Sequence, residues 1–218
     1  MEQDGFGHPK ERSMMNRRKM LTTGFSVVIC LAAGRLAWSA GDARVRLRGT
    51  IESVVGDQLR LTLRNKKLAE VTLPQSVRIT WLLTAPLGDI QPGSYVGTAA
   101  IAQADGTLKA MEVQVFPPSM RGVGEGTHPW DMGPQSSMTN GTVGSLVNAN
   151  GRTMTITYKG GEKRVVVPDG VPIVTYQPAD RAALTAGAHV LVNGTRAADG
   201  SVIANYLSVG KDGLVPPM

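Results

Sequence analysis

The sequence predicts an all-β protein made of two tandem small antiparallel β-barrels, joined by an ordered linker rich in glycine and proline. Three observations lead to this prediction. The 218-residue chain holds 26 glycines and 13 prolines, while 18% of its residues are charged and 5% are aromatic, which suits short strands joined by many turns. Apolar and polar residues alternate over many short stretches, as in half-buried strands. Much of the chain also repeats itself, which indicates one supersecondary unit made twice.

Residues 1–39 have the layout of a secretory signal peptide. A charged start at residues 16–19 precedes an apolar stretch at residues 20–33, and a small-x-small cleavage site ends at Ser39. The apolar stretch is too short to span a membrane comfortably. We therefore expect cleavage after Ser39, with residues 1–13 as an over-long start of the gene.

The same segment suggests an export route and a compartment. Arg17 and Arg18 resemble a twin-arginine export signal, and Arg35 near the cleavage site fits that route. The alternative is a coincidental pair, because any secretory signal needs positive charge. Cys30 is the single cysteine and lies within the signal, so a mature chain without it excludes disulfides, cysteine nucleophiles and thiolate zinc sites. We expect a periplasmic or otherwise exported protein that is not integral to the membrane after signal cleavage.

Residues 44–117 and 140–210 are the two copies of the repeated unit, and residues 211–218 form a tail. Each copy opens with Gly-Thr, a β-branched residue and a serine, and each has an apolar strand that ends in proline. The matching residues are Gly49, Thr50, Ile51, Ser53 and Pro74 in the first copy, and Gly141, Thr142, Val143, Ser145 and Pro168 in the second. The later parts share a glycine, an Asp-Gly pair and an alanine, namely Gly93, Asp105, Gly106 and Ala110 against Gly187, Asp199, Gly200 and Ala204.

The alternation in the first copy predicts short strands. In chain order they are residues 48–55, 59–63, 70–73, 77–81, 95–101 and 108–116. Residues 85–92 are expected to form a loop or one helical turn, matched by residues 178–186 in the second copy, where Asp180 is a candidate cap. Asp105-Gly106 is a strong hairpin signal between the last two strands.

Open edges are a problem for such a unit, because unpaired strands associate with other chains. Closure into a small barrel removes those edges. A five-stranded barrel of the oligonucleotide/oligosaccharide-binding (OB) type fits each copy best. The interior would be filled by alternating valine, isoleucine and leucine residues, for example Val113 and Val115.

Two motifs carry a resemblance to a known group of proteins. They are Leu-x-x-Gly-x-x-Val at residues 184–190 with Asp-Gly-x-x-x-Ala at residues 199–204, and the segment MRGVGEGTHPWD at residues 120–131. Together they resemble a bacterial exported family of unknown function with tandem OB-like β-barrel domains, whose members are sometimes labelled metal ABC transporter permease. That label fits poorly, since a permease needs several membrane-spanning segments. The resemblance implies a fold and a compartment, and it carries no catalytic residues.

The linker, residues 118–139, is the candidate site. Its glycine run at residues 122–126 can form an anion-binding nest beside Arg121, and Trp130 can stack on a ligand. The ligand-binding candidates are Arg121, Gly124, Glu125 and Trp130. The alternative is a plain connection with Trp130 packed as an anchor. We expect the linker to be ordered against one or both barrels, because it is longer than typical loops and unlike a flexible Gly/Ser linker.

Glu125, His128 and Asp131 are also candidate metal ligands. One imidazole and two carboxylates suit a divalent ion such as zinc, manganese or nickel. In this alternative the protein is a periplasmic metal-handling protein that uses the linker cluster.

Charge and motifs favour binding over catalysis. Beyond residue 39 the basic residues outnumber the acidic ones by only three, so we expect no nucleic-acid partner. The sequence has no Walker loop, dinucleotide fingerprint or helix-borne zinc motif, and no supported Ser-His-Asp arrangement. We therefore expect a non-enzymatic binding or interaction module of the bacterial envelope, without a cofactor, whose partner is an unknown envelope protein or small ligand.

Overall fold

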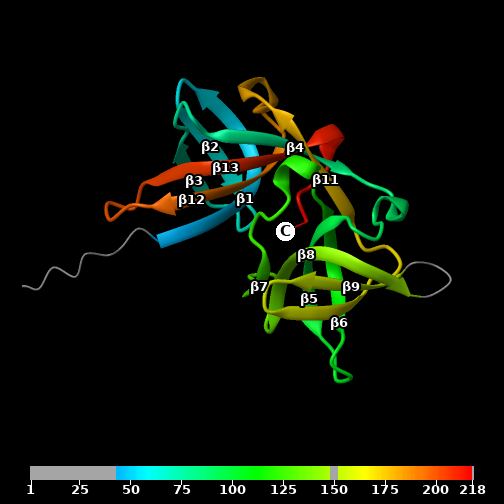
Figure 1. The fold of residues 1–218 in the computed structure, drawn as a ribbon. Coiled ribbons are helices and arrows are strands. Elements are labelled where there is room, and N and C mark those ends of the chain that lie inside the picture. The colour runs from blue at the N-terminus through cyan, green and yellow to red at the C-terminus, as the bar shows by residue number, and fades with distance from the viewer. Residues whose placement is uncertain (1–42, 148–151, 218) are drawn as a thin grey trace, which may run out of the picture. The chain divides into compact units, whose positions relative to one another are not determined.

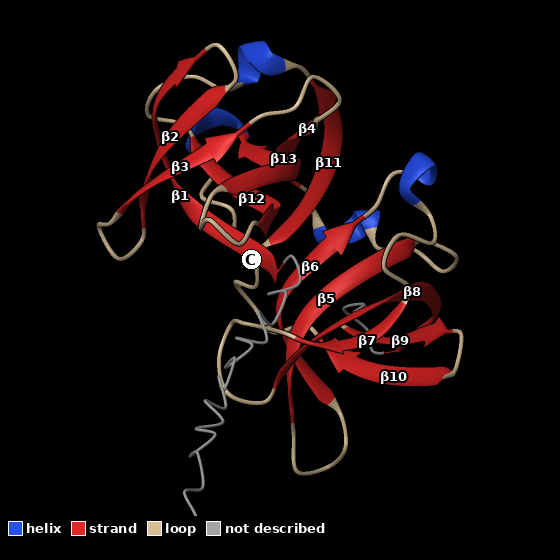
Figure 2. Ribbon diagram, turned by 90° about the vertical axis from the view of Figure 1, so that its left-hand side faces the viewer, coloured by secondary structure: helices blue, strands red, loops and turns tan. Residues whose placement is uncertain are grey.

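Strands make up nearly all the regular structure of this protein (Figures 1 and 2). The computed structural model describes residues 43–147 and 152–217, which belong to one compact unit spanning Ser39–Met218. Within these residues the helices are four 3-10 helices of three residues each, so the predicted all-β class is confirmed. The predicted signal peptide, residues 1–39, lies outside the described residues.

The elements of the first part of the chain recur in the same order in the second part. The first part contains β1 (Ala43–Val55), β2 (Gln58–Leu63), β3 (Leu68–Thr72), β4 (Arg78–Thr84), η1 (Leu87–Asp89), β5 (Tyr95–Ala102), β6 (Leu108–Val115) and η2 (Pro118–Met120). The second part contains β8 (Ser136–Val147), β9 (Thr153–Tyr158), β10 (Gly161–Val166), β11 (Ile173–Ala179), η3 (Arg181–Ala183), β12 (His189–Arg196), β13 (Val202–Gly210) and η4 (Lys211–Gly213). A short strand, β7 (Gly126–Pro129), lies between them.

Hydrogen-bonded pairings close two rings of five strands each. The first ring follows the order β1-β2-β3-β13-β12 and returns to β1, and the second follows β8-β9-β10-β6-β5 and returns to β8. In each ring one parallel pair completes the closure: β13 pairs with β3 and β6 pairs with β10. Neither ring leaves an unpaired edge among these strands, which satisfies the constraint on open edges.

Each ring combines strands from both parts of the chain. β1 to β3 pair with β12 and β13, while β8 to β10 pair with β5 and β6. We expected residues 44–117 and 140–210 to close separately, and the pairings join them instead. The copies do not close separately because the chain leaves its ring after β3 and again after β10. β4 and β11 carry the chain from one ring to the other, and they pair antiparallel with each other from Val174↔Thr84 to Ala179↔Ile79.

In each ring, the strand that carries the shared Gly-Thr-x-x-Ser pattern has a β-bulge within that pattern. The register of β1 shifts between Ile51 and Ser53, and that of β8 shifts at the matching residues. The Ile51 amide donates to the Ala188 carbonyl at 2.9 Å, and the Ile51 carbonyl accepts from the Gly187 amide at 2.8 Å. Val143 makes the matching pair of bonds in the second ring. The repeated sequence pattern is therefore the place where the two parts of the chain join.

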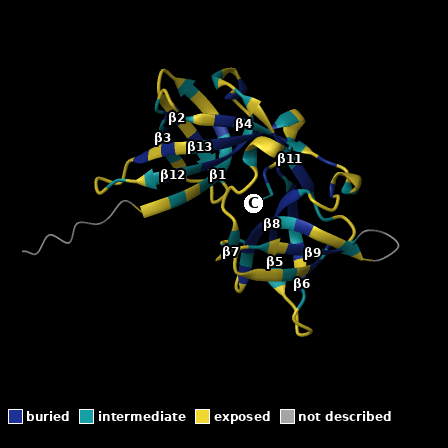
Figure 3. Ribbon diagram, in the orientation of Figure 1, coloured by how far each residue is buried: buried dark blue, intermediate teal, exposed yellow. Residues whose placement is uncertain are grey.

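Three apolar clusters form the core (Figure 3). One fills the first ring, with Leu59, Leu61 and Leu207 among its fully buried members. A second fills the other ring around Ile156 and Val165. The third contains residues from both rings and from β4 and β11, among them Leu82, Phe116, Tyr176 and Leu191, so the outer faces of the rings pack on each other through an apolar contact.

The strand exchange predicts which pairs of engineered cysteines can form a disulfide bond. Arg44 and Thr195 are register partners across β1 and β12, within the reach of a disulfide. In a chain with Cys30→Ser, we expect the Arg44→Cys/Thr195→Cys pair to oxidise quantitatively, measured by thiol titration and by mobility without reductant. The matched control pairs Arg44→Cys with Ile101→Cys, which occupies the position of Thr195 in the other part. A disulfide in the control and none in the first variant would contradict the exchange.

The close approach of strands at Gly141 gives a second test. A Cβ atom there would lie 2.5 Å from the Thr157 carbonyl oxygen and 2.7 Å from Ile156 Cγ2. We expect Gly141→Ala to lower the free energy of unfolding by roughly 1–3 kcal/mol, measured by urea denaturation. Gly88→Ala is the control, since a Cβ there meets nothing within 4 Å. Equal stability of the two variants would show that the strands do not approach this closely.

Candidate functional site

A cavity of about 440 Å³ lies where both rings and the linker meet. Its size is in the usual range for small-molecule sites. Aromatic side chains form much of the wall: Phe116, Trp130, Tyr176 and Tyr206. Arginine and amide side chains supply the polar part, namely Arg44, Arg46, Gln114, Asn140 and Asn193. The wall is thus flat and apolar in places and positively charged in others.

The linker is fixed at this cavity by strand pairing. β7 pairs antiparallel with β8 from Gly126↔Asn140 to Pro129↔Ser137, and β8 pairs with β5 on its other side. The Trp130 amide donates to the Ser136 carbonyl at 2.8 Å, and the Ser136 hydroxyl donates to the Trp130 carbonyl at 2.9 Å. These bonds close the hairpin and hold Trp130 at the cavity wall.

Arginines of β1 hold the next part of the linker. Arg48 donates to both carboxylate oxygens of Asp131, at 2.9 and 2.8 Å, and the Arg46 guanidinium carbon lies 3.7 Å from the Trp130 ring centroid. The hydrogen bond from Arg48 is the main cause that keeps the pKa of Asp131 below its usual value. Burial lowers the pKa of Arg46, and the Asp131 carboxylate opposes that effect. A bidentate pair and a cation–π contact therefore join the first ring to the linker.

A chain of buried polar groups leads inward from the cavity. The Tyr176 hydroxyl donates to Gln114 Oε1 at 2.6 Å, and Gln114 Nε2 donates to Glu112 Oε1 at 3.1 Å. Glu112 is fully buried, and its Oε2 has no hydrogen-bond partner. Burial raises the pKa of Glu112 to about 8, with Arg48 opposing it. Burial is also the main cause that raises the pKa of Tyr176, so both groups are neutral at pH 7.

Asn140 lines the cavity and also has a buried acceptor atom without a partner. Its Nδ2 donates to the Val123 carbonyl at 3.1 Å, while its Oδ1 has no partner. A Cβ at Gly97 would lie 2.5 Å from Oδ1, and a Cβ at Gly124 would lie 2.9 Å from Nδ2, so these two glycines make room for the amide. Trp130 Nε1 is a second buried polar atom without a partner. Such atoms cost free energy unless a bound molecule or water satisfies them.

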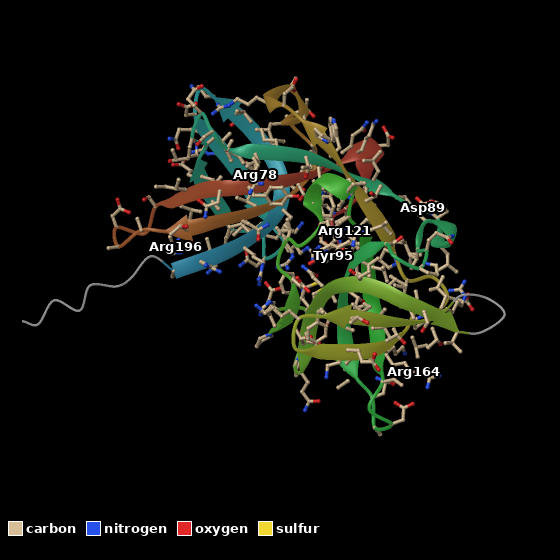
Figure 4. All side chains as sticks on the ribbon, in the orientation of Figure 1. Arg78, Asp89, Tyr95, Arg121, Arg164 and Arg196 are labelled. Carbon is tan, nitrogen blue, oxygen red and sulfur yellow. The ribbon has the colours of Figure 1, made fainter. Side chains whose placement is uncertain are left out.

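Only some of the predicted site residues lie at the cavity. Gly124, His128 and Trp130 line the cavity, whereas Arg121 and Glu125 do not. Arg121 donates to the Gly93 carbonyl at 2.7 Å and lies near the Tyr95 ring (Figure 4), 5.8 Å from its centroid. The sequence analysis missed Asn140 and Glu112, because one polar residue within a strand gives no signal of its own.

The three proposed metal ligands have separate surroundings. The Glu125 carboxylate accepts a hydrogen bond from the Lys159 amide at 2.9 Å, and Asp131 is held by Arg48. Across residues 43–147 and 152–217, no three His, Cys, Asp or Glu side chains are grouped so that they could hold a metal ion. The metal-handling alternative therefore stays a prediction, without a described cluster in its favour.

Comparison with protein-family models, with curated proteins and with solved structures gives no significant match. In the part of the chain that the structure describes, no helix has the length and apolar character needed to cross a membrane. The site is therefore interpreted from its own geometry.

Glu112 predicts a specific dependence of stability on pH. Its pKa rises from 4.5 to about 8 on folding, so the folded state binds the proton more tightly. This contribution is complete below pH 4.5 and is lost as the pH rises through 8. Between these limits we expect the wild-type free energy of unfolding to fall by up to roughly 4 kcal/mol more than that of Glu112→Gln, measured by urea denaturation.

The control for this experiment is Glu70→Gln, which removes an exposed carboxylate paired with Arg60. It should keep the wild-type pH profile. Parallel profiles for wild type and Glu112→Gln would show that Glu112 is ionised in the folded protein at neutral pH.

Proposed function

We propose that this protein is a non-enzymatic binding module of the bacterial envelope, built from two OB-type barrels that exchange their last two strands. The strand order supports the barrel type. In each ring three consecutive strands form hairpins (β1–β3 or β8–β10), and a two-strand hairpin from the other part of the chain completes it. One strand of that hairpin pairs with the first of the three, and the other pairs in parallel with the third, an arrangement compatible with a small Greek-key barrel. The signal-like residues 1–39 support the compartment.

The ligand we propose is a small molecule that combines a flat apolar body with an anionic group. One observation carries this proposal: the cavity brings aromatic walls and two arginines into one place. Aromatic side chains bind flat apolar groups through face and edge contacts. Arg44 and Arg46 attract an anion.

The chemistry of the wall supports binding in preference to catalysis. Among the described residues that line the cavity, none is a carboxylate, a serine, a cysteine or a lysine. These are the usual nucleophiles and bases of enzymes. His128 on β7 is exposed to solvent. A rigid wall with a few polar groups is instead what recognition of a small ligand requires.

A matched pair of probes tests the proposed ligand class. Indole-3-acetate and 4-hydroxybenzoate carry the flat body and the anion, and their primary amides keep the body without the charge. We expect the carboxylates to bind at least tenfold more tightly than the amides at fixed ionic strength, measured by calorimetry. Arg46→Gln should remove most of this difference, because a charge-assisted hydrogen bond contributes about 1.5–3 kcal/mol.

Variants separate this cavity from general surface attraction. Trp130→Ala removes part of the aromatic wall and should weaken the binding of both carboxylates and amides. Arg164→Gln, an exposed change on β10 outside the cavity lining, should have no effect. Equal affinity for acids and amides, or equal loss in Arg46→Gln and Arg164→Gln, would overturn the proposal.

A further inference from the structure

A second, smaller cavity of about 160 Å³ lies on the first ring, between β1, the tip of the β2–β3 hairpin, the start of β12 and the C-terminal tail. Four polar or basic residues line it: Thr50, Arg64, Lys66 and His189. It shares no lining residue with the larger cavity. A ligand here would therefore be bound independently of the proposed function.

The register of β1 with its two neighbouring strands brings Thr50 and His189 side by side. Thr50 pairs with Thr62 across β1 and β2, and with His189 across β1 and β12. The Thr50 hydroxyl lies 3.2 Å from His189 Nδ1. Arg64 Nη2 donates to the Pro216 carbonyl at 2.8 Å, so the tail covers one side of the cavity. Three side chains and the tail thus meet at one end of the ring.

The hairpin tip that supplies Lys66 is itself ordered. The Lys66 amide donates to the Leu63 carbonyl at 2.9 Å, and Asn65 Oδ1 accepts from the Lys67 amide at 3.1 Å. Lys66 adopts a φ of 66°, a conformation that costs free energy for a residue other than glycine. Backbone hydrogen bonds of the hairpin tip therefore hold Lys66 at the cavity, although its positive φ is unfavourable for a lysine.

The second ring provides an internal comparison. By register, Thr142 matches Thr50, and Tyr95 matches His189. Around Thr142 and Tyr95 the linker places a cation: Arg121 donates to the Thr142 hydroxyl at 3.3 Å and lies over the Tyr95 ring (Figure 4). In the second ring, the positive charge at this position comes from Arg121 of the linker. In the first ring, the matching position is a cavity bordered by Arg64 and Lys66 of the ring itself.

We propose that this cavity on the first ring binds a small oxyanion of the phosphate type. Arg64 and Lys66 supply positive charge, while His189 and the Thr50 hydroxyl supply short polar contacts. Guanidinium and ammonium groups are the usual partners of phosphate oxygens. No carboxylate is among the described residues that line the cavity. The carboxylate of Glu52, which accepts a hydrogen bond from the Thr62 hydroxyl nearby, reduces the net positive charge around the cavity.

The experiment is calorimetric titration of the purified protein with inorganic phosphate and with glycerol 3-phosphate, at constant ionic strength. We expect both to bind, because they share the phosphoryl oxygens. Arg64→Gln should weaken binding at least tenfold. His189→Tyr should do the same, and it introduces the residue that the second ring carries at this position, so the variant is expected to fold.

The matched control is Lys159→Gln, which occupies the register position of Arg64 on the second ring. It should leave the affinity for phosphate unchanged. The proposal is overturned if phosphate does not bind to the wild-type protein, or if Lys159→Gln weakens binding as much as Arg64→Gln does. Amide chemical-shift changes confined to Thr50, Lys66 and His189 would place the bound ion directly.

Discussion

The antiparallel pairing of β4 with β11 is the contact on which the rest of the structure depends. Six register pairs, from Val174↔Thr84 to Ala179↔Ile79, join the two strands that carry the chain between the rings. β4 also pairs with β13, and β11 with β6, so all the ring strands form one continuous hydrogen-bonded network. Because each ring takes strands from both parts, neither core can form without the other part of the chain.

The larger cavity is a direct consequence of the exchange. The rings share an apolar contact around Phe116 and Tyr176, whose aromatic rings stack with centroids 5.5 Å apart. Some polar groups in this region are paired, as Arg48 is with Asp131, and burial raises the pKa of Glu112 to about 8. Such an arrangement is preorganised, so a ligand would find its partners in place and lose little free energy to rearrangement.

The two rings have the same order of elements but differ in the residues that surround them. Segments that follow matching strands dock on each ring: the linker after β6 on the second, and the tail after β13 on the first. Their side chains differ. Arg121 brings a cation to the second ring, whereas the first ring has Arg64 and Lys66 of its own beside an open cavity. The same scaffold therefore offers two chemically distinct surfaces, and function has to be read from the residues on them.

The sequence by itself determined the local structure. Alternating residues located the strands and an Asp-Gly pair located a hairpin turn, because both depend on neighbours along the chain. It also singled out Gly124 and Trp130, which line the cavity. The tertiary structure alone decided which copy each strand pairs with, since both copies present the same alternation to a partner. It likewise decided the environments of Asn140, Glu112 and Asp131, whose packing neighbours and partners, such as Gly97 and Arg48, lie far away in sequence.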